Sequence, residues 1–169
     1  MQCFSMVYAG AADAAMREDA HYNYCKLQVE LGGSNFNEEI RSLQAFLHRY
    51  PRSAHRTDIE GYLISACYAA NDLKGAYAIL EEFATSGGAV KRAMQSMAYY
   101  HAAECYSRGD WAEAEEYLNL ALDHKEYDED IAALSLYLLG EVDYQQERYR
   151  EAESMFDQYI ALEMTNQRE

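Results

Sequence analysis

The residues whose types could carry chemistry are few in this chain. His101 and Glu104 lie three positions apart in a helical stretch, so both side chains would face one side and could share a metal ion. Two ligands are fewer than the three or four protein ligands of an ordinary zinc site. The other histidines fall in different turns: His21, His48, His55 and His124. The pattern therefore favours no catalytic residue, no metal ligand and no cofactor.

Known catalytic motifs give the same result. The sequence holds no His-Glu-x-x-His pair, no phosphate-binding glycine loop and no nucleophile motif. We predict that the protein is not an enzyme, and a metal-dependent enzyme built on His101 and Glu104 remains the weakest alternative.

Four cysteines are spread along the chain, at Cys3, Cys25, Cys67 and Cys105. None has the Cys-x-x-Cys spacing of a zinc or redox site. Cys67 and Cys105 occupy equivalent positions in successive helices, farther apart than the roughly 7 Å that a disulfide allows between Cα atoms. We predict four small buried thiols.

The elements that position these residues are indicated by four turn motifs. Each motif is a short run of small or polar residues that ends a helix, followed by one large apolar residue. Those apolar residues are Phe36, Leu73, Trp111 and Tyr149. Their spacing is 37, 38 and 38 residues. A fixed period in this range predicts a stack of helical hairpins, an architecture that usually provides a binding surface.

Apolar residues between the turns recur at steps of three and four, which predicts amphipathic helices. We expect one repeat domain over residues 1–169, with an N-terminal helix over 3–16. The hairpins are expected at about 18–50, 54–85, 88–124 and 127–163. Asp72 and Asp110 are the expected N-caps of the helices that follow them.

The first helix, 3–16, has no partner before it. Its apolar side chains would form an exposed patch, and such patches tend to associate. The patch residues are Met1, Phe4, Val7 and Tyr8. We expect a homodimer, or contact with preceding repeats of a longer chain.

The chain of 169 residues carries a net charge of −15, and the charge is uneven. Residues 104–169 hold eighteen acidic and five basic residues. So negative a surface repels phosphate, which argues against nucleic acid, and attracts basic peptides. The alternative is that the acidic face only keeps a helical protein in solution. No apolar run is long enough to span a bilayer, so membrane insertion is not expected.

The repeat pattern resembles the tetratricopeptide repeat family. The last repeat carries its signature best, at Leu139, Gly140, Tyr144, Tyr149, Ala152 and Phe156. Earlier repeats match at Leu73, Ala76, Leu80, Ala102, Trp111, Ala114 and Leu118. The first repeat matches at Phe36, Leu43 and Pro51 but has Glu39 where the family has a small residue. The resemblance implies an all-α fold, a right-handed α-α superhelix of about four hairpins plus the N-terminal helix.

A narrower resemblance concerns the segments 17–24 and 46–53, which are similar to long tetratricopeptide proteins of the Bacteroidetes. Those proteins are usually larger and often exported to the cell envelope. This resemblance implies that the chain is an excerpt of a longer bacterial protein. The implied location is the periplasm for an exported parent and the cytoplasm otherwise.

In this family the inner face of each first helix lines a concave groove. Projecting the repeat phase onto this chain gives twelve groove positions: His21, Tyr24, Gln28, Asp58, Ser65, Tyr68, Ser96, Tyr99, Tyr106, Tyr137, Glu141 and Tyr144. Tyrosine suits recognition because it offers a large apolar ring with a polar tip. The alternative for Tyr68, Tyr106 and Tyr144 is packing between adjacent hairpins.

The resemblance and the charge together favour a scaffold that binds a protein or peptide on its concave face. The expected partner is basic and carries apolar anchors. The alternative from another class is a structural assembly module that stacks through its ends.

Overall fold

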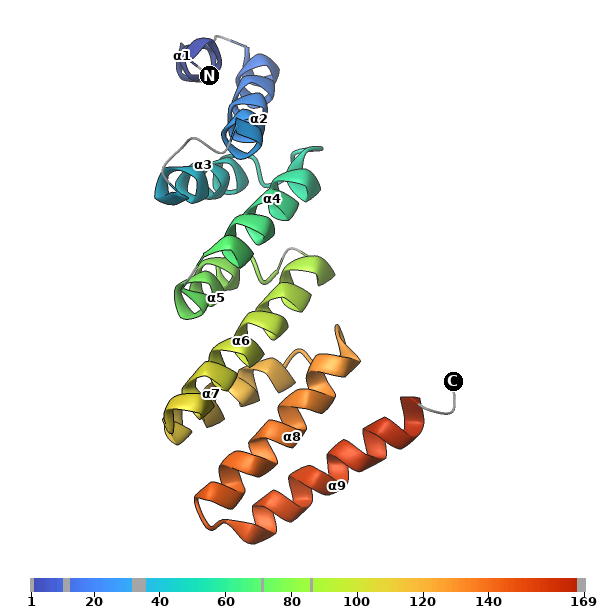
Figure 1. The fold of residues 1–169 in the computed structure, drawn as a ribbon. Coiled ribbons are helices and arrows are strands. Elements are labelled where there is room, and N and C mark those ends of the chain that lie inside the picture. The colour runs from blue at the N-terminus through green and yellow to red at the C-terminus, as the bar shows by residue number, and fades with distance from the viewer. Residues whose placement is uncertain (1, 11–12, 32–35, 71, 86, 167–169) are drawn as a thin grey trace. The chain divides into compact units, whose positions relative to one another are not determined.

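The structure, a computed structural model, describes residues 2–10, 13–31, 36–70, 72–85 and 87–166 (Figure 1). The described residues form nine α-helices and no strand, which confirms the all-α class. The chain divides into two compact units, Met1–Ala69 and Ala70–Glu169. No helix in the described ranges has both the length and the apolarity needed to cross a bilayer.

The first unit contains four helices: α1 (Gln2–Gly10), α2 (Ala14–Leu31), α3 (Phe36–Arg49) and α4 (Arg56–Ala69). Helix α2 packs against α1, α3 and α4, and α3 also packs against α4. Apolar residues at steps of three and four on α3 and α4 fill the core, as the periodicity predicts. The largest fully buried ones are Leu43, Phe46, Leu47, Ile59 and Leu63.

The second unit contains five helices: α5 (Leu73–Glu81), α6 (Gly88–Arg108), α7 (Trp111–Leu122), α8 (Glu129–Gln145) and α9 (Tyr149–Asn166). Helix α6 packs against α5, α7 and α8, while α8 packs against α7 and α9. The pairs α6–α7 and α8–α9 each pack together as neighbours in sequence. The hairpin bounds of 88–124 and 127–163, like that of 18–50, stay predictions. In Figure 1 a short turn joins α8 directly to α9.

The predicted hairpin 54–85 has its two helices, α4 and α5, in different units, so it stays a prediction. The single-domain expectation for residues 1–169 stays a prediction as well.

The expected N-terminal helix over 3–16 is wrong in its bounds, because α1 ends at Gly10 and α2 begins at Ala14. Asp13 starts the second helix. Its carboxylate accepts a hydrogen bond from the backbone N–H of Ala15 at 3.0 Å, and its carbonyl accepts one from Arg17 at 3.1 Å. A side chain that binds the first free N–H groups favours a new helix start there.

The apolar patch expected near the N-terminus falls largely outside the described residues. This holds for Met1 and for the side chains of Phe4 and Tyr8. Val7 is half-buried, and the neighbouring Met6 is exposed.

Two predicted caps have different outcomes. Asp72 caps α5, since its carboxylate accepts a hydrogen bond from the backbone N–H of Gly75 at 2.8 Å. Asp110 stands at the N-cap of α7, but its side chain makes no cap hydrogen bond. Its carbonyl accepts the N–H of Ala114 at 3.0 Å and so begins the helical hydrogen-bond ladder.

The turns within the two hairpins of the second unit share one backbone conformation. Gly109, after α6, has φ of +78°, and Glu147, after α8, has φ of +62°. In each turn the next residue donates its N–H back into the helix, from Asp110 to Cys105 at 2.9 Å and from Arg148 to Asp143 at 2.9 Å. A left-handed residue followed by such a bond is a common helix C-terminal motif, usually with glycine.

Arg148 links the second of these turns to α7. Its guanidinium donates to both carboxylate oxygens of Glu115, at 3.2 and 2.6 Å, and lies 2.6 Å from Oδ1 of Asp143. Asp143 is buried, and that burial raises the pKa of its carboxyl despite the neighbouring guanidinium. The charge pair thus holds a buried acid at the end of α8.

Candidate functional site

The candidate binding surface in the second unit is built from one face of α6 and one face of α8, which pack together. We call it the tyrosine surface, and its residues are Tyr99, Tyr106, Tyr137, Glu141 and Tyr144. A step of seven residues on α6, and steps of four and three on α8, place them on one side of each helix. Tyr106 joins the two helices, because its hydroxyl donates to Oε2 of Glu141 at 3.5 Å.

The two most accessible rings on this surface are Tyr137, which is 45% exposed, and Tyr144, which is 55% exposed. Contacts with α9 fix their orientation. The ring of Tyr137 lies 5.8 Å from that of Phe156 and 5.6 Å from that of Tyr159, and Tyr144 lies 5.4 Å from Tyr149. Rings held in this way lose little conformational entropy when a partner binds.

The tyrosines that α6 contributes to the surface are more buried than those of α8. Tyr99 is half-buried, with its ring edge-on to Tyr100 at 5.4 Å, and burial raises the pKa of its hydroxyl. Tyr106 is half-buried beside Trp111 at 5.2 Å. Burial, and then the charge of Glu141, raises the pKa of Tyr106, so its hydroxyl stays protonated as a donor.

Ser96, also projected onto the groove, is buried on α6 and donates its hydroxyl to the carbonyl of Arg92 at 3.2 Å. A buried side chain offers no surface to a partner. Ser96 therefore packs within the unit and is not part of the tyrosine surface.

Two groove positions of the first unit are buried as well. His21 packs edge-on against Phe46 at 5.3 Å and Tyr50 at 5.8 Å, and burial lowers the pKa of its imidazole to about 4. The amide of buried Gln28 donates to the hydroxyl of half-buried Tyr24 at 3.2 Å.

The other first-unit positions are exposed. Asp58 accepts a hydrogen bond from the hydroxyl of Tyr22 at 3.1 Å, and Ser65 donates to the carbonyl of Gly61 at 2.9 Å. Tyr68 is exposed on α4. The structure does not join these three into one cluster.

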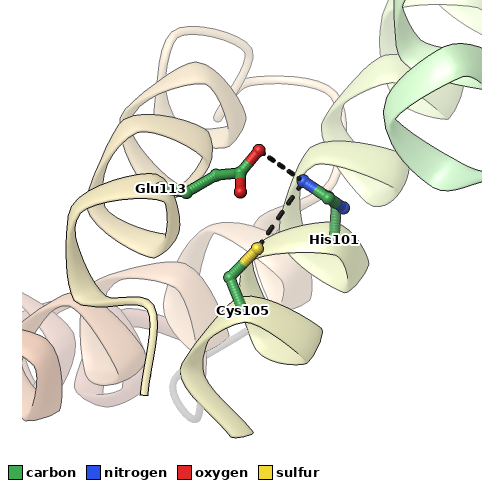
Figure 2. Close-up of side chains that lie close together, drawn as sticks. All are labelled: His101, Cys105 and Glu113. Carbon is green, nitrogen blue, oxygen red and sulfur yellow. Dashed lines mark hydrogen bonds and ion pairs between the residues drawn. The ribbon is translucent and has the colours of Figure 1, made fainter. Parts of the chain in front are cut away.

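A different cluster lies between α6 and α7, where His101, Cys105 and Glu113 converge (Figure 2). Nε2 of His101 is 3.3 Å from Oε1 of Glu113 and 3.6 Å from Sγ of Cys105. His101 and Cys105 are buried one helical turn apart on α6, and Glu113 belongs to the first turn of α7.

Two cations border this cluster. Nζ of Lys74 lies 2.5 Å from Oε1 of Glu113, and a guanidinium nitrogen of Arg108 lies 3.2 Å from Sγ of Cys105. The hydrogen bond from Lys74, followed by that from His101, lowers the pKa of the Glu113 carboxyl to about 2. Glu113 is therefore an anion at neutral pH.

The cluster differs from the pair considered on the sequence. Glu104 is exposed on α6, and the structure brings Cys105 to His101 in its place. Sequence reasoning missed Cys105 and Glu113 as neighbours. The available signal was the four-residue step from His101 to Cys105, together with an acid in the first turn of the next helix.

The cysteines follow the prediction in three positions. Cys25, Cys67 and Cys105 are buried, whereas Cys3 is exposed, so the prediction for Cys3 is wrong. Cys3 belongs to α1, where Met6 is exposed as well. None of the four forms a disulfide in the structure. Burial raises the pKa of the Cys25 thiol to about 11 and that of Cys67 to about 12.

Comparison with known proteins finds a family similarity for part of the chain. Residues 89–162, from α6 into α9, match the family model described as tetratricopeptide repeat. The match supports the resemblance stated from the sequence for this part of the chain. No curated protein matches the chain. Repeats of this family generally mediate protein–protein interaction and are typically not catalytic.

Proposed function

We propose that the protein is a scaffold that binds a protein or peptide segment, and that the tyrosine surface of α6 and α8 is its binding site. The observation that carries the proposal is the pair Tyr137 and Tyr144, two accessible rings oriented by α9 on either side of Glu141. Aromatic side chains of this kind are enriched among the residues that dominate binding energy.

The chemistry of the surface indicates the partner. Exposed rings accommodate aromatic or aliphatic anchors, and the carboxylate of Glu141 between them favours a lysine or arginine. The part of the chain that supplies Tyr106, Tyr137, Glu141 and Tyr144 is strongly negative, with eighteen acidic and five basic residues in 104–169. We therefore propose a basic segment with apolar anchors as the partner, in preference to an acidic one or a nucleic acid.

Three of the predicted groove residues are buried, which reduces the set of proposed contact residues. His21, Gln28 and Ser96 contribute to packing. Tyr99, Tyr106, Tyr137, Glu141 and Tyr144 remain as the proposed contact set. Tyr24, Asp58, Ser65 and Tyr68 of the first unit stay predictions for a second contact region.

The family resemblance also suggests an origin and a location. A bacterial source related to the Bacteroidetes proteins, and export to the cell envelope with a longer parent chain, remain proposals. The full reading frame of the gene would test both.

Self-association through the ends is the competing function. Light scattering on the purified chain separates the two: a monomer at high concentration favours a free binding surface, and a dimer favours an assembly module. The N-terminal patch would then be tested with Met6→Ser, since Met6 is 75% exposed on α1.

The binding test begins with selection from a displayed random peptide library. Selected peptides are expected to carry aromatic or aliphatic residues together with lysine or arginine. Calorimetry then compares the parent chain with Tyr137→Ala and Tyr144→Ala, each checked for intact helicity. A buried aromatic anchor typically contributes about 2 kcal/mol or more, so each variant should bind at least about tenfold more weakly.

Two further variants complete the design. Glu141→Gln should slow association at low salt more than it speeds dissociation, because an accessible charge acts mainly on encounter. Ile160→Ala removes an exposed apolar side chain of α9 outside the tyrosine surface and should leave affinity unchanged. If folded Tyr137→Ala and Tyr144→Ala both retain full affinity for selected peptides, the tyrosine surface is not the site.

A further inference from the structure

The cluster of His101, Cys105 and Glu113 has the geometry of a metal site. With ordinary zinc bond lengths, a tetrahedral ion separates a ligand nitrogen from a sulfur by about 3.5 Å and from an oxygen by about 3.3 Å. The corresponding separations here are 3.6 Å from Nε2 of His101 to Sγ of Cys105 and 3.3 Å to Oε1 of Glu113. All three ligand atoms lie within 4.8 Å of one another.

Hydrogen bonds join these three ligand atoms in pairs, with Nε2 of His101 shared between the other two. Nε2 of His101 faces both a thiol sulfur and a carboxylate oxygen, and it can carry only one proton. With that proton it donates to one neighbour at a time, and without it Nε2 can accept the thiol proton of Cys105 while its lone pair faces that of Glu113. A cation at the centre is attracted to all three atoms at once.

We propose that His101, Cys105 and Glu113 bind a divalent cation of the zinc type, with the fourth position left to water. The set of one thiolate, one imidazole and one carboxylate selects zinc or a similar borderline ion. Magnesium and calcium require mainly oxygen ligands and would be poorly held by a sulfur and a nitrogen.

The charges at the site change in a defined way on binding. The thiol of Cys105 loses its proton to solvent and binds as the thiolate, and Glu113 binds as the carboxylate. Their two negative charges balance the divalent ion. Lys74, which now contacts Glu113, is displaced at small cost because its side chain is 60% exposed.

Arg108 acts on the sulfur as Lys74 acts on the carboxylate, because each cation favours the anionic form of its neighbour. Burial raises the pKa of the Cys105 thiol, and the contact of Arg108 with Sγ at 3.2 Å offsets part of that by favouring the thiolate. Arg108 is exposed, so it leaves freely when the ion binds. The route of entry is through Glu113, whose side chain is 26% exposed, since His101 and Cys105 are buried.

The scaffold around the site is already rigid. The rings of His101 and of Tyr117 on α7 meet edge to face, with centroids 4.4 Å apart, which limits the orientation of the imidazole. His101 and Cys105 belong to α6 and Glu113 to α7, so a bound ion would join the two helices of one hairpin. This role is independent of the tyrosine surface.

The test uses the whole chain, reduced and freed of metal with a chelator. Titration with Co²⁺ should give one equivalent of binding and the near-ultraviolet absorption of a thiolate–cobalt bond, and Zn²⁺ should displace the cobalt. Cys105→Ser should abolish the band. Mutation of residues that merely support a metal ligand already costs about 10- to 100-fold in affinity, so His101→Asn and Glu113→Gln should weaken zinc binding by more than about tenfold.

Two control variants distinguish this site from non-specific binding of the metal ion by another cysteine. Cys67→Ser removes another buried cysteine, in α4, and should leave the cobalt band intact. Lys74→Gln removes the competing ammonium and should tighten zinc binding, an effect that a merely structural ion pair would not produce. Circular dichroism confirms the fold of each variant, and the accessible Glu113→Gln is informative even where Cys105→Ser destabilises the chain.

The proposal is overturned by any of four results, of which three come first. These are a parent chain without a thiolate–cobalt band, zinc affinity unchanged in both folded His101→Asn and Glu113→Gln, or a band that disappears in Cys67→Ser. A band that persists in folded Cys105→Ser has the same consequence.

Discussion

The ring of Phe156 in α9 occupies the space that a side chain at Gly140 in α8 would need. A β-carbon built on Gly140 would lie 2.6 Å from Cε1 of Phe156, closer than real contacts allow. The absence of a side chain therefore lets the two helices of the last hairpin approach closely. The same principle applies to Ala102 and Ala114, both fully buried in α6 and α7.

Gly140→Ala should destabilise the protein by about 1–3 kcal/mol, the usual cost of overpacking a core. Urea unfolding monitored by circular dichroism measures the effect. Gly61→Ala is the matched control, because Gly61 is also inside a helix and a β-carbon added there would meet nothing within 4 Å. That control should be stabilising by about 0.5–1 kcal/mol. Equal effects of the two substitutions would contradict the close approach.

Much of the helical pattern could be predicted from the spacing of four apolar residues. Helices α3, α5, α7 and α9 begin at those residues, namely Phe36, Leu73, Trp111 and Tyr149. A helix start has a local signal, because a polar or left-handed residue must precede it. The break before Ala14 was missed because Asp13 stands in a run of small residues that read as one apolar stretch.

Glu147→Gly should stabilise the second unit. Glu147 has φ of +62°, a conformation that costs an ordinary residue about 1–2 kcal/mol, and glycine adopts it freely. After the entropy that glycine loses on folding, we expect a net gain of about 0.5–1 kcal/mol in the free energy of unfolding. The reverse change at the equivalent turn, Gly109→Ala, should be destabilising. If both substitutions shift thermal stability in the same direction, the two turns do not share this constraint.

Arg148→Met should destabilise the protein by about 3 kcal/mol at neutral pH, because it leaves Asp143 buried without its cation. The pKa of Asp143 is already raised by burial and would rise further without Arg148. An acid whose folded pKa is raised costs stability above that pKa, and the cost is relieved as pH falls. The deficit should therefore be smaller at pH 5 than at pH 8.

The control for this charge pair is Glu115→Gln, which removes the other partner of Arg148 and leaves the contact with Asp143. Its effect should be smaller than that of Arg148→Met, since Glu115 is partly exposed. A deficit in Arg148→Met that does not change with pH would argue against an unpaired Asp143.

His21 should make the first unit sensitive to mild acid. Its folded pKa, lowered from 6.5 to about 4 by burial and then by Arg49, means that the unfolded chain takes up a proton first. The stability contributed by neutral His21 is present above pH 6.5 and is lost as pH falls toward 4, by about 2 kcal/mol. Denaturant unfolding between pH 7 and 4.5 should show a flatter pH profile for His21→Gln than for the parent chain. Parallel profiles would contradict this account.

The candidate sites were less accessible to sequence reasoning than the helices. Repeat phase placed His21, Gln28 and Ser96 on a groove, but phase alone cannot tell which side of a helix a neighbouring helix covers. His101 faces a partner on α7, and whether Glu104 or Cys105 shares that side depends on how α6 is rotated. The rotation of α6 about its axis is set by packing at positions such as Ala102 and Ala114. Because these side chains are small, the sequence alone does not determine that rotation.

The bond between Lys74 and Glu113 bears on how fast the second unit folds. These residues are 39 positions apart, and the other hydrogen bonds described between helices of this unit join residues 12 to 35 positions apart. Short loops cost little entropy to close, and chains dominated by such local contacts fold in microseconds to milliseconds. We therefore expect the second unit to form its native topology early in folding, with each folded hairpin providing a surface on which the next one packs.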